Sequence, residues 1–140
     1  MVNYKLSTYL GSALSICFGV WHFFIPTIFE WYSYMDTNAQ ELVFAVRATN
    51  LFFSLIMVLL GTMNIIIISS KHTSKHTITT ILLVNIILWF TRVVAQIIAP
   101  QGTINFYMQY GMLIAFMMVL LFYVLAILLY LKLPIEKIIS

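Results

Sequence analysis

The segment 41–69, ELVFAVRATNLFFSLIMVLLGTMNIIIIS, constrains this chain more than any other stretch. It is almost entirely apolar from Leu42 to Ile68, which exceeds the ~20 residues that a helix needs to cross a bilayer. Arg47 nevertheless lies inside the apolar run, at a depth of roughly 7–8 Å for a rise of ~1.5 Å per residue. A charge at that depth costs free energy, so one face of this helix needs polar surroundings.

One face of the same helix is polar or small along its length. Steps of three and four residues, which keep to one side of a helix, give Arg47, Asn50, Ser54, Met57, Gly61 and Asn64. All but the methionine are polar or small, while most other positions are large and apolar. This stripe favours a face turned toward protein or water, with the apolar remainder turned toward lipid.

The composition predicts that this helix is one of several membrane spans. The chain has 140 residues, of which 63% are hydrophobic and 8% charged, whereas soluble domains average about 45–50% and about 25%. The predicted spans are about 8–29, 41–69, 77–99 and 104–131. Short connections predict antiparallel neighbours, hence an all-α integral membrane four-helix bundle with up-down-up-down order and a single transmembrane domain over residues 1–140.

The lysines predict the orientation of a multi-pass protein of the cell membrane. They lie at the amino terminus, in the 70–76 connection and in the carboxyl-terminal tail: Lys5, Lys71, Lys75, Lys132 and Lys137. By the positive-inside rule these parts, including both termini, face the cytoplasm. The 30–41 connection then faces outside, where its aromatic cluster is typical of an interfacial belt: Trp31, Tyr32 and Tyr34.

Several kinds of chemistry have no basis in the sequence. The single Cys17 excludes an intrachain disulfide and a paired-thiol redox motif, and one cysteine with three histidines predicts no metal site. The metalloprotease, nucleophile-elbow, phosphate-loop and calcium-loop motifs are absent, so no catalytic residues are predicted. No basic patch is interleaved with aromatic residues, so nucleic acid is not an expected partner. A non-enzymatic role is favoured.

The first span carries a second polar stripe. Steps of three and four residues give Thr8, Ser12, Ser15, Gly19, His22 and Pro26. Pro26 has no N–H, so in a continuing helix the carbonyl of His22 loses its donor. The sequence therefore predicts a polar locus where this carbonyl lies beside the imidazole. The small residues of the stripe are more typical of helix packing.

The last two spans are interpreted in the same way. The third span places Asn85, Trp89, Arg92 and Gln96 on one face, and Pro100 is expected to free the carbonyl of Gln96. In the fourth span a face of smaller residues is predicted to pack closely against the other helices: Tyr107, Gly111, Ala115 and Met118.

The deep polar groups are expected to converge on the outer half of the bundle. They are His22, Arg47, Asn50, Arg92 and Gln96, with Glu30 and Glu41 at the rim. Two arginines that face one cavity repel each other unless an anion lies between them. Because a guanidinium matches carboxylate and phosphate geometry, the leading hypothesis is an accessory or binding subunit with an outward-opening pocket. Arg47 and Arg92 would hold an anionic lipid headgroup or a small anionic ligand, and His22, Asn50 and Gln96 would orient it.

Two other hypotheses stay open. In a quinone-linked redox subunit, His22 would bond a quinone carbonyl, and Trp21 and Trp89 would flank the ring. In a structural or assembly subunit, the buried charges would only fix helix register, for example with one arginine paired to Glu30. No resident cofactor is predicted outside the quinone alternative. The expected partner is membrane lipid, and a homo-oligomer or a larger membrane complex is left open.

The segment GVWHFFIP at residues 19–26 resembles the first helix of DoxX-like small four-helix membrane proteins. In that group a Gly-x-x-His-Phe-like stretch runs to a proline, and the four-span size agrees. The resemblance implies a small membrane subunit of a respiratory or quinone-linked system, or an assembly factor. The early arginine expected in that group is absent, since the first span opens with Lys5 only.

Overall fold

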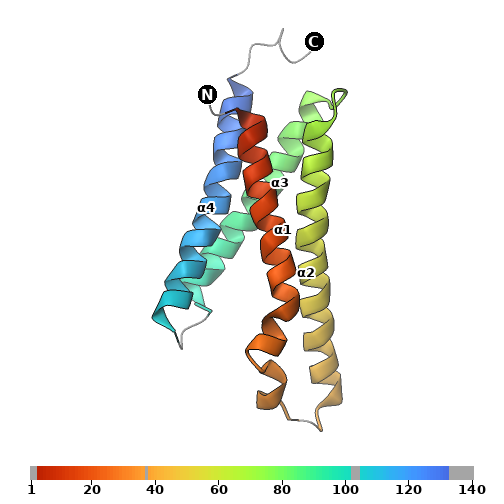
Figure 1. Ribbon diagram of the computed structural model, residues 1–140, viewed down its shortest axis with the longest axis vertical. Helices are drawn as coiled ribbons and strands as arrows, with labels where there is room; N and C mark the ends of the chain where they lie inside the picture. Colours follow the sequence, from red (N-terminus) through yellow and green to blue (C-terminus); the bar gives the residue numbers. More distant parts are fainter. Residues whose placement is uncertain (1–2, 37, 102–104, 133–140) are drawn as a thin grey trace. The chain divides into compact units, whose positions relative to one another are not determined.

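The computed structural model describes residues 3–36, 38–101 and 105–132, which form helices and short connections and contain no strand. The long helices are α1 (Tyr4–Ile28), α2 (Gln40–Ser69), α3 (Lys75–Ile98) and α4 (Phe106–Leu131), with a short 3-10 helix, η1 (Trp31–Tyr34), after α1 (Figure 1). All four are long and apolar enough to cross a membrane. The all-helical class and the four candidate spans are therefore confirmed, while the up-down-up-down order and the cytoplasmic termini stay predictions.

The helix ends lie within a few residues of the predicted spans. The predicted start of the last span, residue 104, lies outside the described residues. Two of the starts have side-chain caps. The Ser74 hydroxyl accepts a hydrogen bond from the Thr77 N–H (3.1 Å), and Oδ1 of Asn105 accepts one from the Tyr107 N–H (2.9 Å). These caps satisfy backbone donors that have no partner within the helix.

The chain leaves α1 through a left-handed residue. Glu30 has φ 49°, the only positive φ at a non-glycine position among the described residues. Its carbonyl accepts hydrogen bonds from the Ser33 N–H (2.9 Å) and the Ser33 hydroxyl (2.8 Å). A left-handed residue just beyond a helix end stops the helix and turns the chain, which here leads into η1.

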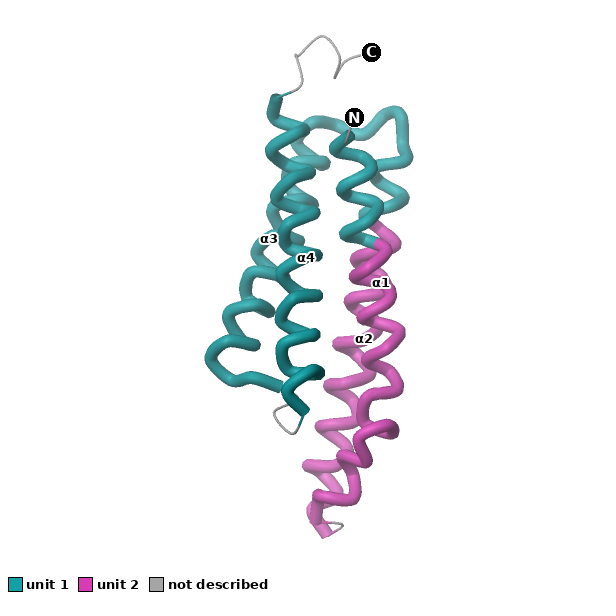
Figure 2. The backbone as a smooth tube through the Cα atoms, turned by 60° about the vertical axis from the view of Figure 1, so that its left-hand side comes forward, with its two compact units in different colours: residues 1–12, 64–140 teal, residues 13–63 magenta. Residues whose placement is uncertain are grey.

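The chain divides into two compact units (Figure 2). Unit 2 is residues 13–63, which contain most of α1, most of α2 and the connection between them. Unit 1 is residues 1–12 and 64–140, which contain α3, α4 and the remaining ends of α1 and α2. The predicted single domain over the whole chain stays a prediction.

In unit 1, α3 and α4 pack against each other. The ring of Trp89, which is 1% exposed, lies 5.8 Å from that of Phe116 between ring centroids. The buried face of α4 follows steps of three and four residues: Phe116, Val119, Tyr123, Ala126 and Tyr130. Regular spacing of this kind places all five on one side of the helix.

The predicted packing face of α4 is wrong. Tyr107 is 85% exposed and Met118 is 47% exposed. A Cβ added at Gly111 would meet no atom within 4 Å. The physical reason is that α4 is apolar on every side, so its small residues do not select a face. The buried face instead contains Tyr123 and Tyr130, whose hydroxyl groups lipid cannot hydrogen-bond.

In unit 2, α1 and α2 approach most closely at a glycine. A Cβ at Gly19 would lie 2.8 Å from Cγ2 of Val58 and 2.9 Å from the backbone oxygen of Ser54. These distances are too short for any side chain, so the two backbones approach this closely only because residue 19 is glycine. The packing role predicted for the small residues of the first stripe is confirmed at this position.

Candidate functional site

The proline inside α1 creates the polar locus that the sequence predicts. Pro26 has no N–H for the carbonyl of His22, four residues earlier. The side chain of Asn50, on α2, supplies the missing donor: its Nδ2 donates to the His22 oxygen at 3.0 Å. A side chain from a neighbouring helix thus restores the bond that the proline removes.

Asn50 also contacts the imidazole. Its Oδ1 lies 3.4 Å from Nδ1 of His22. Because a backbone carbonyl can only accept, the NH2 group of Asn50 must face the His22 oxygen, and Oδ1 must then face the ring. In this contact Nδ1 is therefore the donor. The ring of Phe53 meets the imidazole edge-on at 4.8 Å between centroids, so two residues of α2 orient His22.

Arg47 lies one turn before Asn50 on α2, and its side chain is exposed. The carbon of its guanidinium lies 4.5 Å from the ring centroid of Tyr32, a cation–π contact. The N–H groups of a guanidinium point outward in its own plane, so stacking on a ring does not consume them.

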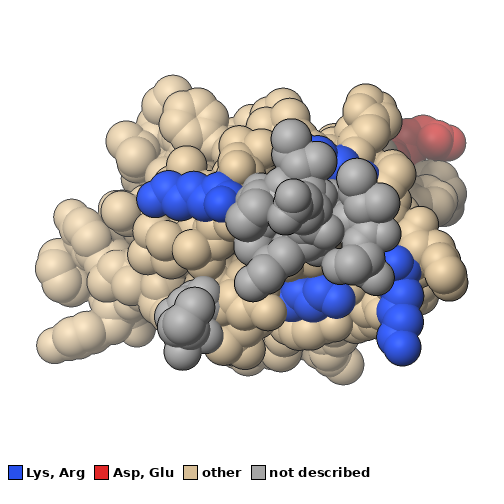
Figure 3. All heavy atoms as spheres, turned by 90° about the horizontal axis from the view of Figure 1, so that it is seen from above, with Lys and Arg blue, Asp and Glu red and all other residues tan. Residues whose placement is uncertain are grey.

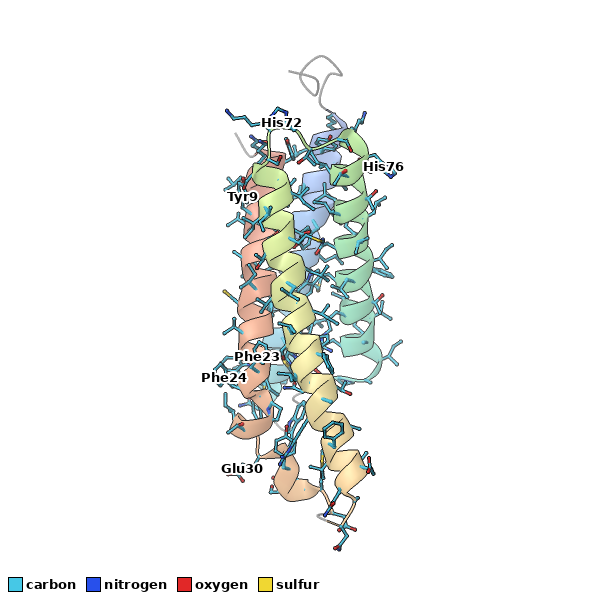
Figure 4. All side chains as sticks on the ribbon, turned by 90° about the vertical axis from the view of Figure 1, so that its right-hand side faces the viewer. Tyr9, Phe23, Phe24, Glu30, His72 and His76 are labelled. Carbon is cyan, nitrogen blue, oxygen red and sulfur yellow. The ribbon has the colours of Figure 1, made fainter. Side chains whose placement is uncertain are left out.

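Glu30, which the structural alternative pairs with one of the arginines, forms no ion pair with Arg47. Glu30 lies on the turn after α1 (Figure 4). Within the described part of the chain, neither Arg47 nor Glu30 takes part in an ion pair. Glu41, in the first turn of α2, is exposed. The guanidinium is therefore held by an aromatic ring and carries no neutralising carboxylate from these residues.

The arginine of unit 1 is engaged differently. Arg92 is half-buried, and its Nη2 donates to Oε1 of Gln101 at 2.7 Å. The guanidinium carbon lies 4.8 Å from the ring centroid of Phe116. One edge and one face of this guanidinium thus meet other residues of unit 1.

Gln96 joins the two ends of the α3–α4 connection. It is 4% exposed, and its Nε2 donates to the carbonyls of Gln101 (3.1 Å) and Gln109 (3.3 Å). The freed carbonyl of Gln96 stays a prediction; α3 ends at Ile98, so Pro100 follows the helix and does not interrupt it. A proline disfavours helical backbone at the residue before it, which explains the earlier end.

The predicted site residues fall into two groups. Unit 2 brings His22 and Asn50 into contact and places Arg47 on the same face of α2. Unit 1 joins Arg92 and Gln96 through Gln101. A single clamp made by both arginines stays a prediction. Of the two tryptophans, Trp21 is 50% exposed and Trp89 is 1% exposed.

Unit 1 contains a buried hydrogen-bond network that the sequence analysis did not predict. Tyr123 OH lies 3.2 Å from the Ser12 hydroxyl and accepts from Nδ2 of Asn64 at 3.1 Å. Nδ2 of Asn85 donates to Oδ1 of Asn64 at 3.1 Å. None of the four residues is more than 2% exposed. The predicted polar faces include Ser12, Asn64 and Asn85. Tyr123 could have been found as a tyrosine in the middle of the most apolar helix.

The chain matches no protein-family model, no curated protein and no solved structure. The resemblance to DoxX-like proteins, which comes from residues 19–26, therefore stays a prediction. The same holds for the quinone-linked role that this resemblance implies.

Proposed function

We propose that this chain is a multi-pass membrane protein, acting as a binding or accessory subunit, that holds an anionic lipid headgroup or a small anion at Arg47. The proposal rests on the accessibility of the Arg47 guanidinium. It is exposed, stacked on Tyr32, and free of any ion pair with another described residue. A phosphate or carboxylate would meet two parallel N–H groups without first displacing an internal partner.

The position of Arg47 along α2 supports a headgroup as the ligand. It follows the first residue of α2, Gln40, by seven positions, or roughly 10 Å at ~1.5 Å per residue. That depth is near the end of a membrane span. Tyrosine and tryptophan are enriched at the level of the headgroups, and Tyr32 belongs to such an aromatic cluster. The stack on Tyr32 keeps the long arginine side chain in one place, which lowers the entropy lost on binding.

The His22–Asn50 pair is proposed to form the polar floor of this site. Asn50 lies three residues after Arg47, so the two side chains are neighbours on the surface of α2. Both polar atoms of the Asn50 amide are directed at His22. The pair therefore orients the local backbone, and the charge that attracts the anion comes from Arg47.

Native mass spectrometry of gently extracted protein tests the proposal. The wild type should carry a phospholipid or a small anion, and Arg47→Gln should reduce its occupancy about tenfold, because a charge-assisted bond is worth roughly 1.5–3 kcal/mol. Arg47→Lys keeps the charge and loses the planar fork, so its occupancy should fall between the two. Arg92→Gln is the matched control, since that guanidinium already meets Gln101 and Phe116.

The outcomes separate the alternatives. Loss of the ligand in both Gln variants would support the joint clamp of two arginines. A co-purifying quinone would support the redox subunit. Full occupancy in Arg47→Gln would exclude the arginine as the anchor.

The proposed orientation has its own test. In a Cys17→Ser chain, single cysteines at Ser74 and Asn38 place one thiol on each side of the predicted membrane. In intact cells an impermeant thiol reagent should label position 38 and spare position 74, because the lysines hold the α2–α3 connection inside. The reverse pattern would show that the Arg47 end faces the cytoplasm.

A further inference from the structure

Two hydroxyl groups in unit 1 are buried without a hydrogen-bond partner. They are Oγ of Ser7 and the phenol oxygen of Tyr130, and each residue is 1% exposed. Neither hydroxyl has a hydrogen-bond partner among the described residues. Buried polar groups are nearly always hydrogen-bonded, and a hydroxyl surrounded by apolar groups is costly. Two such groups in one region therefore call for an explanation.

Both hydroxyls belong to the same end of unit 1. The ring of Tyr130, near the end of α4, lies 5.0 Å from the ring of Tyr4, the first residue of α1. Ser7 follows Tyr4 by three positions, so the two side chains share one face of α1. The two hydroxyls thus lie where the start of α1 meets the end of α4.

Lysines lie close to these two residues along the chain. Lys5 stands two residues before Ser7, and Lys132 stands two residues after Tyr130. A hydrogen bond between the Tyr9 and Ser69 hydroxyls, 3.1 Å long, ties the end of α2 to α1. The connection that follows α2 contains Lys71 and His72, α3 begins with Lys75 and His76, and all four residues are exposed. In Figure 4 both histidines lie at the same end as Tyr9.

Among the described residues, the positive charge at this end has no acidic counterpart. Figure 3 shows the basic side chains gathered on this face. Among the described residues, unit 1 contains no aspartate or glutamate. Neither α1 nor α3, both of which begin at this end, has an acidic residue in its first turn. Helix starts are the positive ends of the helix dipoles and normally attract acidic groups, so their field here adds to that of the lysines.

We propose that this end of unit 1 binds the phosphate group of an anionic membrane lipid. The hydroxyls of Ser7 and Tyr130 would donate to phosphate oxygens, and Lys5 and Lys132 would supply the charge. Lipid is the source that the geometry favours, because these residues lie at the ends of membrane-length helices, where headgroups are. Juxtamembrane lysine clusters attract anionic lipids for the same reason. The site is separate from Arg47 and does not depend on it.

Entry of a phosphate oxygen requires a small movement. The two hydroxyls are covered, but Tyr4, whose ring packs on that of Tyr130, is partly exposed. Rotation of the Tyr4 side chain would open the way to them. Surface side chains change rotamer on a fast timescale, so this is no barrier to binding.

The experiment uses the full chain in nanodiscs of phosphatidylcholine, with or without phosphatidylglycerol. The key variant, Ser7→Ala with Tyr130→Phe, removes the two hydroxyls and little else. Without anionic lipid it should be as stable as the wild type or more so, since no unmatched hydroxyl remains to bury. The wild type should gain thermal stability from phosphatidylglycerol, and the variant should lose most of that gain and about tenfold in lipid affinity measured by native mass spectrometry.

Matched controls define the result. Tyr9→Phe removes a neighbouring hydroxyl that has a partner, and it should keep the full lipid response. Lys5→Gln with Lys132→Gln should lose the response as the key variant does. An unchanged response in the hydroxyl variant would overturn the proposal and leave only general attraction to the lysines.

Two further arms identify the ligand and separate this site from the first. Inorganic phosphate added to phosphatidylcholine nanodiscs should give no stabilisation, and a full effect would make free phosphate the ligand. Arg47→Gln should leave the response intact. Loss of the response in Arg47→Gln would show that the stabilisation comes from the Arg47 site and would overturn the assignment to this end.

Discussion

The two compact units use the same residue types in opposite ways. In unit 1 four deep polar residues form a network around Asn64, which bonds Tyr123 and Asn85, and all four are buried. In unit 2 the polar contact between the side chains of His22 and Asn50 is partly exposed at both residues. A closed network fixes helix register, whereas a partly exposed pair leaves polar surface beside an accessible arginine.

The charges divide in the same way. The charged residues described in unit 1 are all cationic, whereas unit 2 contains Arg47 together with Glu30, Asp36 and Glu41. Long-range attraction therefore favours anions at unit 1, whereas an anion proposed at Arg47 would depend on contact geometry. The contrast teaches that an arginine within an apolar span is understood only from the groups around it.

The largest expected effect concerns the network of unit 1. Asn64→Leu removes the donor to Tyr123 and the acceptor of Asn85, leaving buried polar atoms short of partners. We expect a loss of about 2–3 kcal/mol in the free energy of unfolding, measured by reversible denaturation in mixed micelles. The matched variant Asn50→Leu should cost roughly half as much, because its site is partly exposed. Equal losses would remove the distinction between the two units.

The next largest effect is the difference in stability between alanine substitutions at Gly19 and Gly111. Gly19→Ala should destabilise the protein by about 1–3 kcal/mol, because the new methyl group would overlap Val58 and the backbone of Ser54. Gly111→Ala meets open space and should be neutral, or stabilising by up to ~1 kcal/mol through helix propensity. Thermal unfolding of the two variants, read by circular dichroism, gives the comparison. A stable Gly19→Ala protein would contradict the close approach of α1 and α2.

A double-mutant cycle tests the origin of the polar locus in unit 2. Pro26→Ala restores an N–H that can bond the His22 carbonyl within α1, so Asn50 is no longer needed for that bond. Asn50→Ala should then cost about 1 kcal/mol less in the Pro26→Ala background than in the wild type. Unfolding free energies of the four proteins give the coupling. Additive effects would mean that the proline and the asparagine act independently.

The smallest effect compares the arginines in stability without added lipid. Arg92→Gln loses a hydrogen bond and a contact with a ring and should cost about 1 kcal/mol. Arg47→Gln loses only the contact with Tyr32 at an exposed position and should stay within ~0.5 kcal/mol of the wild type. Denaturation curves of the two variants decide the order. A larger loss in Arg47→Gln would indicate a structural role for Arg47 and would weaken it as a ligand anchor.

The sequence by itself determined the helices and much of their buried faces. Apolar length and spacing are local properties, so the four spans and the polar faces of the first three follow from the order of residues. The stripe in α1 predicted burial at Thr8, Ser12 and Ser15, and all three are at most 3% exposed. The missing donor at Pro26 was equally local, because a proline removes a known hydrogen bond wherever it stands in a helix.

Only the tertiary structure decided the partners. Which side chain replaces that donor depends on how α2 lies against α1, and no local pattern names Asn50. Which arginine keeps its guanidinium accessible depends on Tyr32 and Gln101, both outside the apolar spans. The face of α4 was also undetermined, because a helix that is apolar on all sides has no preferred direction until its Tyr123 hydroxyl meets Ser12 and Asn64 on other helices. Partner choice is a property of helix register in three dimensions, and hydropathy along one dimension does not contain it.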